Sequence, residues 1–101
     1  MSAEDELTLI HEEKGDRGGF YLRNGSCRTL AEMEYKKREF PVLEFHHTWV
    51  DDSLRGQGRA GQLLDAAMSW VRESKHTVKP VCAYVKKQFE KQESLHDLRA
   101  E

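Results

Sequence analysis

The chain has 101 residues and a formal net charge of −2, a size typical of one domain with a single two-layer core. No apolar run approaches the roughly 18 residues that a membrane-spanning helix needs, which argues against a membrane protein. Residues 1–5 lack the charged and apolar regions of a secretion signal. We therefore expect one compact domain over residues 1–101, with 92–101 as a polar tail, a cytoplasmic location, and Cys27 and Cys82 as reduced thiols.

Charge is distributed unevenly along the chain. Residues 1–54 carry seven Lys and Arg against twelve Asp and Glu, whereas residues 55–91 carry eight against three. The basic segment begins at a glycine-rich turn, as expected if a compact polyanion docks there. The acidic first half would suit a cationic partner. Solvated helix and strand faces explain both halves equally, and no nucleic acid or membrane partner is expected.

Four strands are expected in the first half of the chain. The first covers residues 7–13, and the next two flank Asn24-Gly25, a pair that favours a two-residue hairpin turn. After that turn, mostly apolar residues at 29, 31, 33 and 35 alternate with more polar ones, which is typical of a half-buried antiparallel strand. Gly18-Gly19 is expected to mark another turn.

The fourth strand, FPVLEFHHTWV at 40–50, is rich in β-branched and aromatic residues. Strict alternation divides its side chains between two faces, with Leu43, Phe45, His47 and Trp49 on one and Glu44, His46, Thr48 and Val50 on the other. Because neighbouring positions then face opposite ways, only one of the two histidines can reach a given site.

The second half of the chain changes period. Apolar residues recur every three or four positions between 60 and 71, which predicts a helix over 58–75 with one buried stripe. Trp70 falls off that stripe and could cover a partner. KPVCAYV at 79–85 predicts a fifth strand, and residues 85–100 a short helix with its tail. This order predicts an α+β fold, a mostly antiparallel sheet of about five strands with the long helix on one face.

The junction between the fourth strand and the long helix carries three glycines. Gly56, Gly58 and Gly61 fit G-x-G-x-x-G, but the chain is too short for a dinucleotide fold and the next strand ends without an acidic residue. A Walker turn is excluded because no Gly-Lys-Ser/Thr follows. Glycines let the backbone approach a ligand, and a helix start offers free N–H groups and partial positive charge. The turn therefore suits a pyrophosphate.

The segment Arg55-Gly56-Gln57-Gly58-Arg59-Ala60 matches Arg/Gln-x-x-Gly-x-Gly/Ala in a strand, turn and helix context. It resembles the acyl-CoA signature of the GNAT superfamily of N-acetyltransferases. HTWV at 47–50 and PVCAY at 80–84 extend the resemblance, over nearly the whole chain, to a small single-domain YjdJ-like branch of that superfamily. The branch lacks the later strands that carry substrate contacts in full-length enzymes.

The resemblance implies acetyl-CoA as cosubstrate and a place for each of its parts. The strand before the turn should splay from the next one, so that the backbone of Thr48, Trp49 and Val50 binds the pantetheine arm. The pyrophosphate should lie on the N–H groups of residues 56–60, with Arg55 or Arg59 adding charge. Lys86 and Lys87 could meet the remaining phosphate, or could be ordinary surface lysines.

Acetyl transfer needs a deprotonated amine, a polarised carbonyl and a proton for the departing thiolate. His47, then His46 and Glu44, are candidates for the base, because histidine titrates near neutral pH. In the resembled branch Cys82 lies beside the thioester, where it could accept the acetyl group or simply line the pocket. Tyr84 could protonate the CoA thiolate. A packing role remains open for His47, Cys82 and Tyr84.

Two functions follow from these residues. The first is an acetyl-CoA-dependent N-acetyltransferase acting on an unidentified amine of a small molecule or a protein. The second is a CoA-binding module with little or no turnover. No metal site is expected, because the adjacent His46 and His47 cannot both ligate from one strand face and the other histidines show no ligand spacing.

Overall fold

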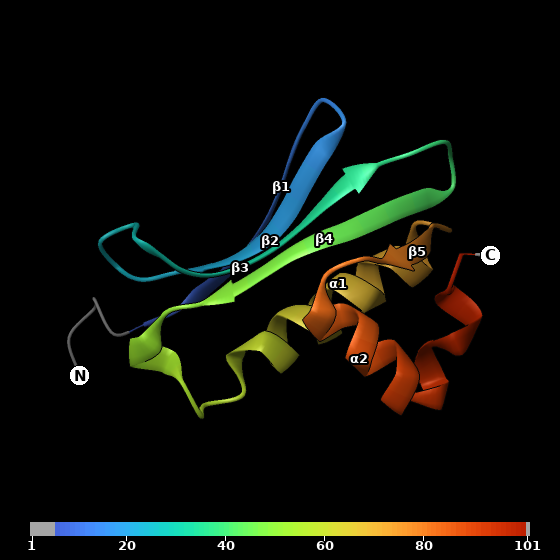
Figure 1. The fold of residues 1–101 in the computed structure, drawn as a ribbon. Coiled ribbons are helices and arrows are strands. Elements are labelled where there is room, and N and C mark those ends of the chain that lie inside the picture. The colour runs from blue at the N-terminus through green and yellow to red at the C-terminus, as the bar shows by residue number, and fades with distance from the viewer. Residues whose placement is uncertain (1–5, 101) are drawn as a thin grey trace.

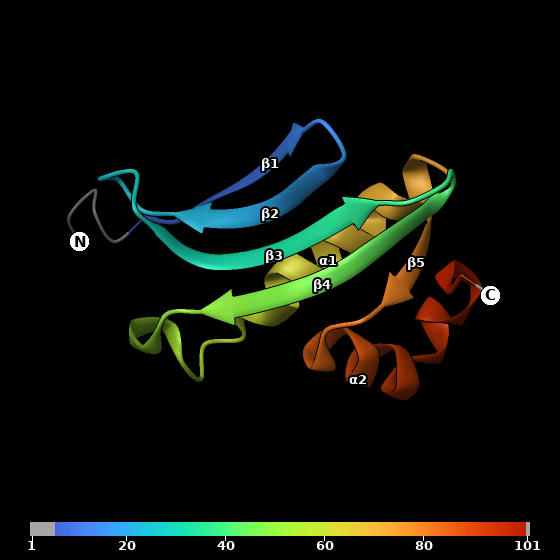
Figure 2. The ribbon, with the colours of Figure 1, turned by 45° about the horizontal axis from the view of Figure 1, so that its top comes forward.

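The computed structural model describes residues 6–100, so residues 1–5, which are expected to lack a secretion signal, lie outside it. One sheet runs in the order β1-β2-β3-β4-β5 (Figures 1 and 2). The strands are β1 (Thr8–Lys14), β2 (Arg17–Arg23), β3 (Thr29–Lys37), β4 (Val42–Val50) and β5 (Thr77–Pro80). Neighbours from β1 to β4 are antiparallel, and β5 pairs parallel with β4. The predicted α+β class is confirmed.

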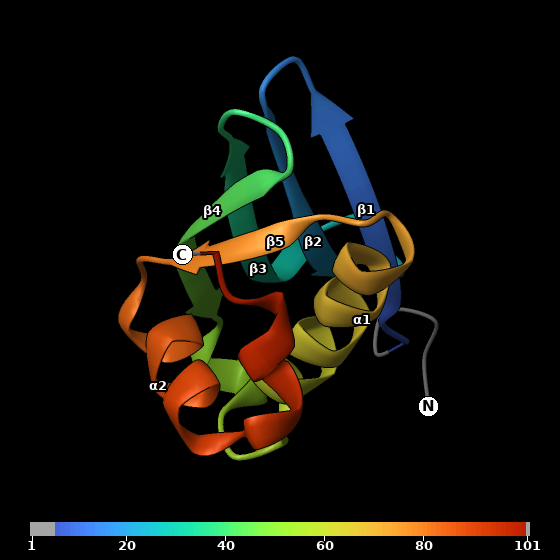
Figure 3. The same ribbon diagram turned by 90° about the vertical axis from the view of Figure 1, so that its right-hand side faces the viewer.

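Both α-helices, α1 (Arg59–Glu73) and α2 (Ala83–Lys91), lie on the same face of the sheet (Figures 1 and 3). We call this the helix face, and the other the outer face. The core lies between the helices and the sheet. It includes Leu63, Leu64, Ala67, Met68 and Val71 of α1, which confirms the predicted stripe. Among residues 6–100, no helix is both long and apolar enough to cross a membrane.

The chain after β5 differs from the prediction of a strand over 79–85. The amides of Val81 and Cys82 both donate to the Phe45 carbonyl, at 2.9 and 3.0 Å. These two bonds end the pairing of β5, and Cys82 becomes the N-cap of α2. β-Branched and aromatic residues favoured a strand here, but a tertiary contact decides the conformation.

Residues 92–100 are not the predicted polar tail. Residues Glu93–Leu98 form a 3-10 helix, in which Leu95 and Leu98 lie three positions apart and both reach the core. The Ala100 amide then donates to the Val78 carbonyl at 2.7 Å, which fixes the end of the described chain against β5.

Both predicted glycine turns are placed differently. The Asn24-Gly25 connection is a longer loop: the Asn24 amide donates to the Arg28 carbonyl, and Cys27 carries the positive φ of 63°. Gly18 and Gly19 lie within β2. A Cβ at Gly18 would stand 2.5 Å from the Tyr35 ring, so the rings of neighbouring side chains explain this glycine pair.

Trp70 is partly buried and packs against the core in an aromatic cluster, which explains this side chain without a partner. Its ring centroid lies 4.4 Å from that of His11, 5.5 Å from Tyr35 and 5.3 Å from His76. The predicted apolar stripe of α1 wrongly left out Trp70, because an aromatic side chain is long enough to reach the sheet from the edge of the helix.

Candidate functional site

The turn into α1 has the backbone conformation that its glycines allow. Gly56 has φ 77°, and Gly58 has φ 71° and ψ 22°, both in the left-handed region that costs other residues about 1–2 kcal/mol. A Cβ would meet nothing within 4 Å at either position. These glycines are therefore required by conformation, and the space beside them is open.

The start of α1 offers free amide hydrogens. Gly58 is the N-cap and makes no side-chain capping bond, and the first helical bond runs from the Gln62 amide to the Gly58 carbonyl at 3.1 Å. The amides of residues 58–61 precede that bond, where a helix leaves its donors without intrahelical acceptors. No acidic residue lies in the first turn to compete for them. This arrangement suits an anion.

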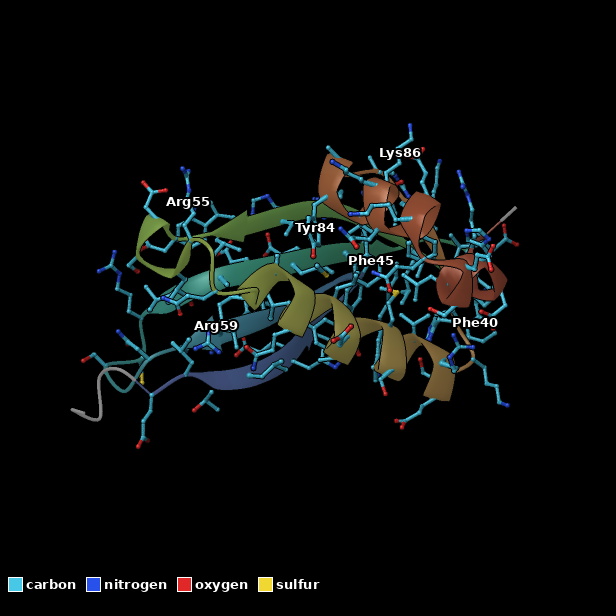
Figure 4. All side chains as sticks on the ribbon, turned by 90° about the horizontal axis from the view of Figure 1, so that it is seen from below. Phe40, Phe45, Arg55, Arg59, Tyr84 and Lys86 are labelled. Atoms are coloured by element: carbon cyan, nitrogen blue, oxygen red, sulfur yellow. The ribbon has the colours of Figure 1, made fainter. Side chains whose placement is uncertain are left out.

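The two arginines of the turn lie on opposite sides of the loop that leads into α1 (Figure 4). Arg55 is largely exposed and pairs with Asp52 at 2.9 Å. Arg59 donates from Nη1 to Gln62 at 2.9 Å, whereas its buried Nε has no hydrogen-bond partner within the described residues. Both arginines thus lie in the turn, and these polar contacts join them to nearby residues of the same segment.

β4 parts from β5 halfway along its length. β5 pairs with Val42–Phe45 only, so the edge of β4 from residue 46 to 50 is not covered by β5. The Asp51 amide donates to Leu30 on the β3 side, and strand alternation therefore turns the backbone groups of Thr48 and Val50 toward the open edge. Trp49 presents its backbone to β3 instead.

Cys82 and Thr48 meet where the two strands part. The Cys82 sulfur lies 3.2 Å from the Thr48 hydroxyl oxygen. Tyr84 follows in the first turn of α2, and its hydroxyl lies 4.0 Å from the place that a Cβ on Gly61 would take. Figure 4 shows Tyr84 between α1 and α2 on the helix face. Burial, followed by the charges of Asp65 and Cys82, raises the pKa of Tyr84, so its phenol is protonated at neutral pH.

A bulge in β4 changes the predicted faces. Tyr35 pairs with Phe45 and Glu34 with His47, which leaves His46 as the extra residue. Beyond the bulge Thr48 turns to the helix face, and His47 turns to the outer face, where its Nε2 lies 2.9 Å from Glu32 and 3.8 Å from Glu34. The predicted pairing of His47 with Leu43 and Phe45 on one face is wrong for this reason.

The remaining candidates lie apart from the turn. Lys86 and Lys87 are exposed on α2, and Figure 4 shows Lys86 on the side of α2 that faces away from α1. Glu44 is held by Arg38 at 2.9 Å, and this bond keeps the pKa of its carboxyl below the usual range. The surface-lysine interpretation therefore fits Lys86, and Glu44 is poorly suited to accept a proton.

The outer face carries a cavity that the sequence analysis did not anticipate. Its volume is about 540 Å³, and its lining includes Glu12, Lys14, Arg17, Glu34 and His46. Both histidines of the bulge thus belong to the outer face, His46 at the cavity wall and His47 beside it. The sequence signal that could have indicated this cavity is the pair Gly18 and Gly19 within β2, because glycines in a strand leave room for a ligand or another side chain.

Glu32, Glu34 and His47 also place one donor atom each within 4.8 Å of one another. This grouping differs from the histidine pairs considered in the sequence, because it uses two carboxylates from β3. The His47 ring already lies next to both carboxylates, so side-chain contacts explain the grouping and it assigns no metal.

The family model of GCN5-related N-acetyltransferases matches residues 19–98. The chain belongs to this family. The match spans the glycine turn, the β4 edge and Cys82, and so covers all the residues brought together on the helix face. It confirms the resemblance drawn from the RGQGRA segment.

Solved and curated relatives of this N-acetyltransferase family member agree with the assignment. A GCN5-like protein from Staphylococcus aureus, solved by NMR, superposes with a TM-score of 0.71 at 27% identity, over 99% of this chain and 91% of the other. Protein NATD1 from Xenopus tropicalis is 30% identical over 86% of this chain and 78% of its own length. Human NATD1 is 28% identical over 80% and 70%.

Proposed function

We propose that the protein is an acetyl-CoA-dependent N-acetyltransferase that acetylates an amine. The observation that supports this most is the glycine turn, where left-handed Gly56 and Gly58 precede free amides at the start of a 15-residue helix. Family membership supplies the reaction class. The open edge of β4 lies directly before that turn, so one ligand could use both.

The cosubstrate would lie on the helix face. Its pyrophosphate would accept bonds from the free amides of residues 58–61, with Arg55 or Arg59 adding charge-assisted bonds. Its pantetheine arm would bind the free backbone groups of Thr48 and Val50 as an added strand does. The thioester would then reach the place where β4 and β5 part, beside Cys82.

The reaction would run in two balanced steps. The Cys82 sulfur attacks the thioester carbonyl, its bond to the acetyl carbon forms as the bond to the CoA sulfur breaks, and the thiol proton passes to the CoA thiolate. Tyr84, protonated and close to Cys82, would carry that proton. The neutral amine then attacks acetyl-Cys82, and the C–N bond forms as the bond between the acetyl carbon and the Cys82 sulfur breaks. His47 would accept the proton that the nitrogen loses, and a proton from solvent would restore the Cys82 thiol.

Binding of coenzyme A tests the turn. In Gly58→Asp the new side chain tolerates positive φ better than most, but it puts a negative charge against the pyrophosphate. We therefore expect the affinity for coenzyme A, measured by calorimetry, to fall about a hundredfold. Gly15→Asp is the matched control, because Gly15 also has φ 62° with nothing within 4 Å, and its affinity should be unchanged. Undisturbed amides at 55–61 in a titration with coenzyme A would rule out the proposal.

Mass spectrometry after mixing with acetyl-CoA tests Cys82. We expect an acetyl adduct on Cys82 that is lost in Cys82→Ser and retained in Cys27→Ser, since Cys27 is exposed in the loop before β3. Transfer to amines without an adduct would make the attack direct and leave Cys82 lining the pocket. Tight binding of coenzyme A with no adduct and no transfer would favour the alternative, a CoA-binding module.

A further inference from the structure

The outer face carries its charges in rows that run across the strands. Lys14, Arg17 and Lys36 occupy neighbouring register positions on β1, β2 and β3, so three cations lie side by side. Two residues along each strand, the next row reads Glu12, Gly19, Glu34 and His47. A cationic row therefore borders an acidic one, and the cavity of about 540 Å³ is lined by both.

Gly19 has no side chain, so the Tyr21 side chain lies over it beside the acidic row, where Tyr21 and Glu34 both line the cavity. A Cβ at Gly19 would stand 2.5 Å from the Tyr21 hydroxyl and 3.1 Å from Glu34 Cγ. That hydroxyl donates to Glu34 Oε2 at 2.8 Å. Burial, with Glu34 adding to it, raises the pKa of Tyr21, so the phenol keeps its proton and fixes the Glu34 carboxylate at the cavity wall.

Several of these charges have no partner of opposite sign. Within residues 6–100, Lys14, Arg17 and Lys36 have no carboxylate oxygen within 4.0 Å, and Glu34 has only the His47 ring, at 3.8 Å. Glu12, by contrast, is paired with Arg23 at 2.7 Å. Like charges directly opposite one another across strands are destabilising. An anionic group on the cationic row and a cationic group at Glu34 would relieve both imbalances.

We infer that this cavity binds an acceptor amine that also carries an anionic group, such as an amino acid, with its ammonium at Glu34 and its anionic group at Lys14 and Arg17. The inference rests on the proposed function, for which it names the class of acceptor. The rows are two residues apart along a strand, about 6.7 Å. This spacing suits a linear ω-amino acid better than a short diamine. His46, in the bulge of β4, lies at the cavity wall. The same part of β4 lies beside Cys82 on the helix face.

A matched set of three probes tests the charge requirement. We would titrate the ¹⁵N-labelled full chain, without coenzyme A, with 5-aminopentanoate, pentanoate and 1-aminopentane. The zwitterion should shift the amides of Gly18, Gly19 and Glu34 and bind about tenfold or more tighter than either singly charged probe. Equal affinity for the zwitterion and 1-aminopentane, or no shift with the zwitterion, would overturn the inference.

Charge-neutralising variants locate the two ends. Replacing Lys14 and Arg17 by Gln should bring the zwitterion down to the affinity of 1-aminopentane, and Glu34→Gln, which keeps an acceptor for Tyr21, should bring it down to that of pentanoate. Lys91→Gln and Glu90→Gln, both exposed on α2, are the controls and should leave affinity unchanged. Loss of affinity in the controls would contradict the assignment.

The same spectra separate this inference from the proposed function. Coenzyme A is read at the amides of residues 56–61, on the other face. If coenzyme A shifts those amides and 5-aminopentanoate shifts none, the acceptor class is wrong and the proposed function stands. If 5-aminopentanoate binds and coenzyme A does not, the cavity is no acceptor site and the proposed function fails.

Discussion

Tyr84 is the residue with which proton delivery to the thiolate can be tested most sharply. Its phenol reaches from α2 toward Gly61 of α1, and burial with nearby negative charge raises its pKa, so it holds a proton at neutral pH. We expect Tyr84→Phe to lower kcat about a hundredfold, within the range for loss of a general acid, and to leave the Kd of coenzyme A within about twofold. Thiol release measures the first and calorimetry the second.

The pH profile of the same variant distinguishes chemistry from packing. If Tyr84 donates a proton, the fall in kcat at high pH that its deprotonation causes should be present in the unsubstituted chain and absent from Tyr84→Phe. A purely structural role would lower kcat without changing the profile, and an unchanged kcat would remove Tyr84 from the reaction.

At the scale of elements, α1 is attached to the sheet by the aromatic cluster around Trp70. The Trp70 ring contacts His11 of β1 and Tyr35 of β3, and it also stacks with His76, which follows the end of α1. Trp49, on β4, is 41% exposed instead. We expect Trp70→Ala to lower the free energy of unfolding by about 3 kcal/mol and Trp49→Ala by less than about 1 kcal/mol, as urea denaturation would show. Equal losses would contradict the cluster.

Elements were predictable from sequence where one local pattern decides them. The helical stripe of α1 and the alternation of β3 were confirmed, because periodicity is a local property of the sequence. The predicted strand faces and strand bounds near the site were wrong where a single long-range contact or a bulge decides the conformation. The bulge at His46 reverses the faces of β4, and the two bonds to the Phe45 carbonyl turn the strand predicted at Cys82 into a helix start.

At the scale of the whole molecule, β4 separates two surfaces that the proposed reaction joins. The glycine turn, Thr48, Cys82 and Tyr84 lie on the helix face, and the cavity with His46 lies on the outer face. β5 stops pairing with β4 at Phe45, next to the bulge. The sheet is therefore open at the point where the acceptor amine on one face would have to reach the acetyl group on the other. Both helices cover the same face, which leaves the outer face free for an acceptor.

Stability of the whole fold should depend on pH through His11, which joins β1 to α1. Its ring stacks on Phe20 at 4.1 Å, and its Nε2 lies 2.6 Å from the Tyr35 hydroxyl. That hydroxyl gives its proton to Glu13 at 2.6 Å, so the His11 ring is the donor. Burial lowers the pKa of His11 below its ordinary 6.5, in opposition to the charge of Glu13. The folded state therefore disfavours the protonated imidazole relative to the unfolded chain.

The sign of the pH dependence follows from which state binds the proton first. As pH falls through 6.5, the unfolded chain protonates His11 while the folded chain does not, so the free energy of unfolding decreases until the pH passes the lowered folded pKa. The pKa of Glu13 is lowered too, because bonds from Tyr35 and Lys37 outweigh its burial, but its contribution to stability is lost only below about pH 4.5.

Urea unfolding between about pH 7.5 and 5.5 thus tests His11 without a contribution from Glu13. His11→Phe keeps a ring against Phe20 and should flatten the slope, whereas His96→Gln, at an exposed position, should retain it. A slope that survives in His11→Phe would place the titrating group elsewhere.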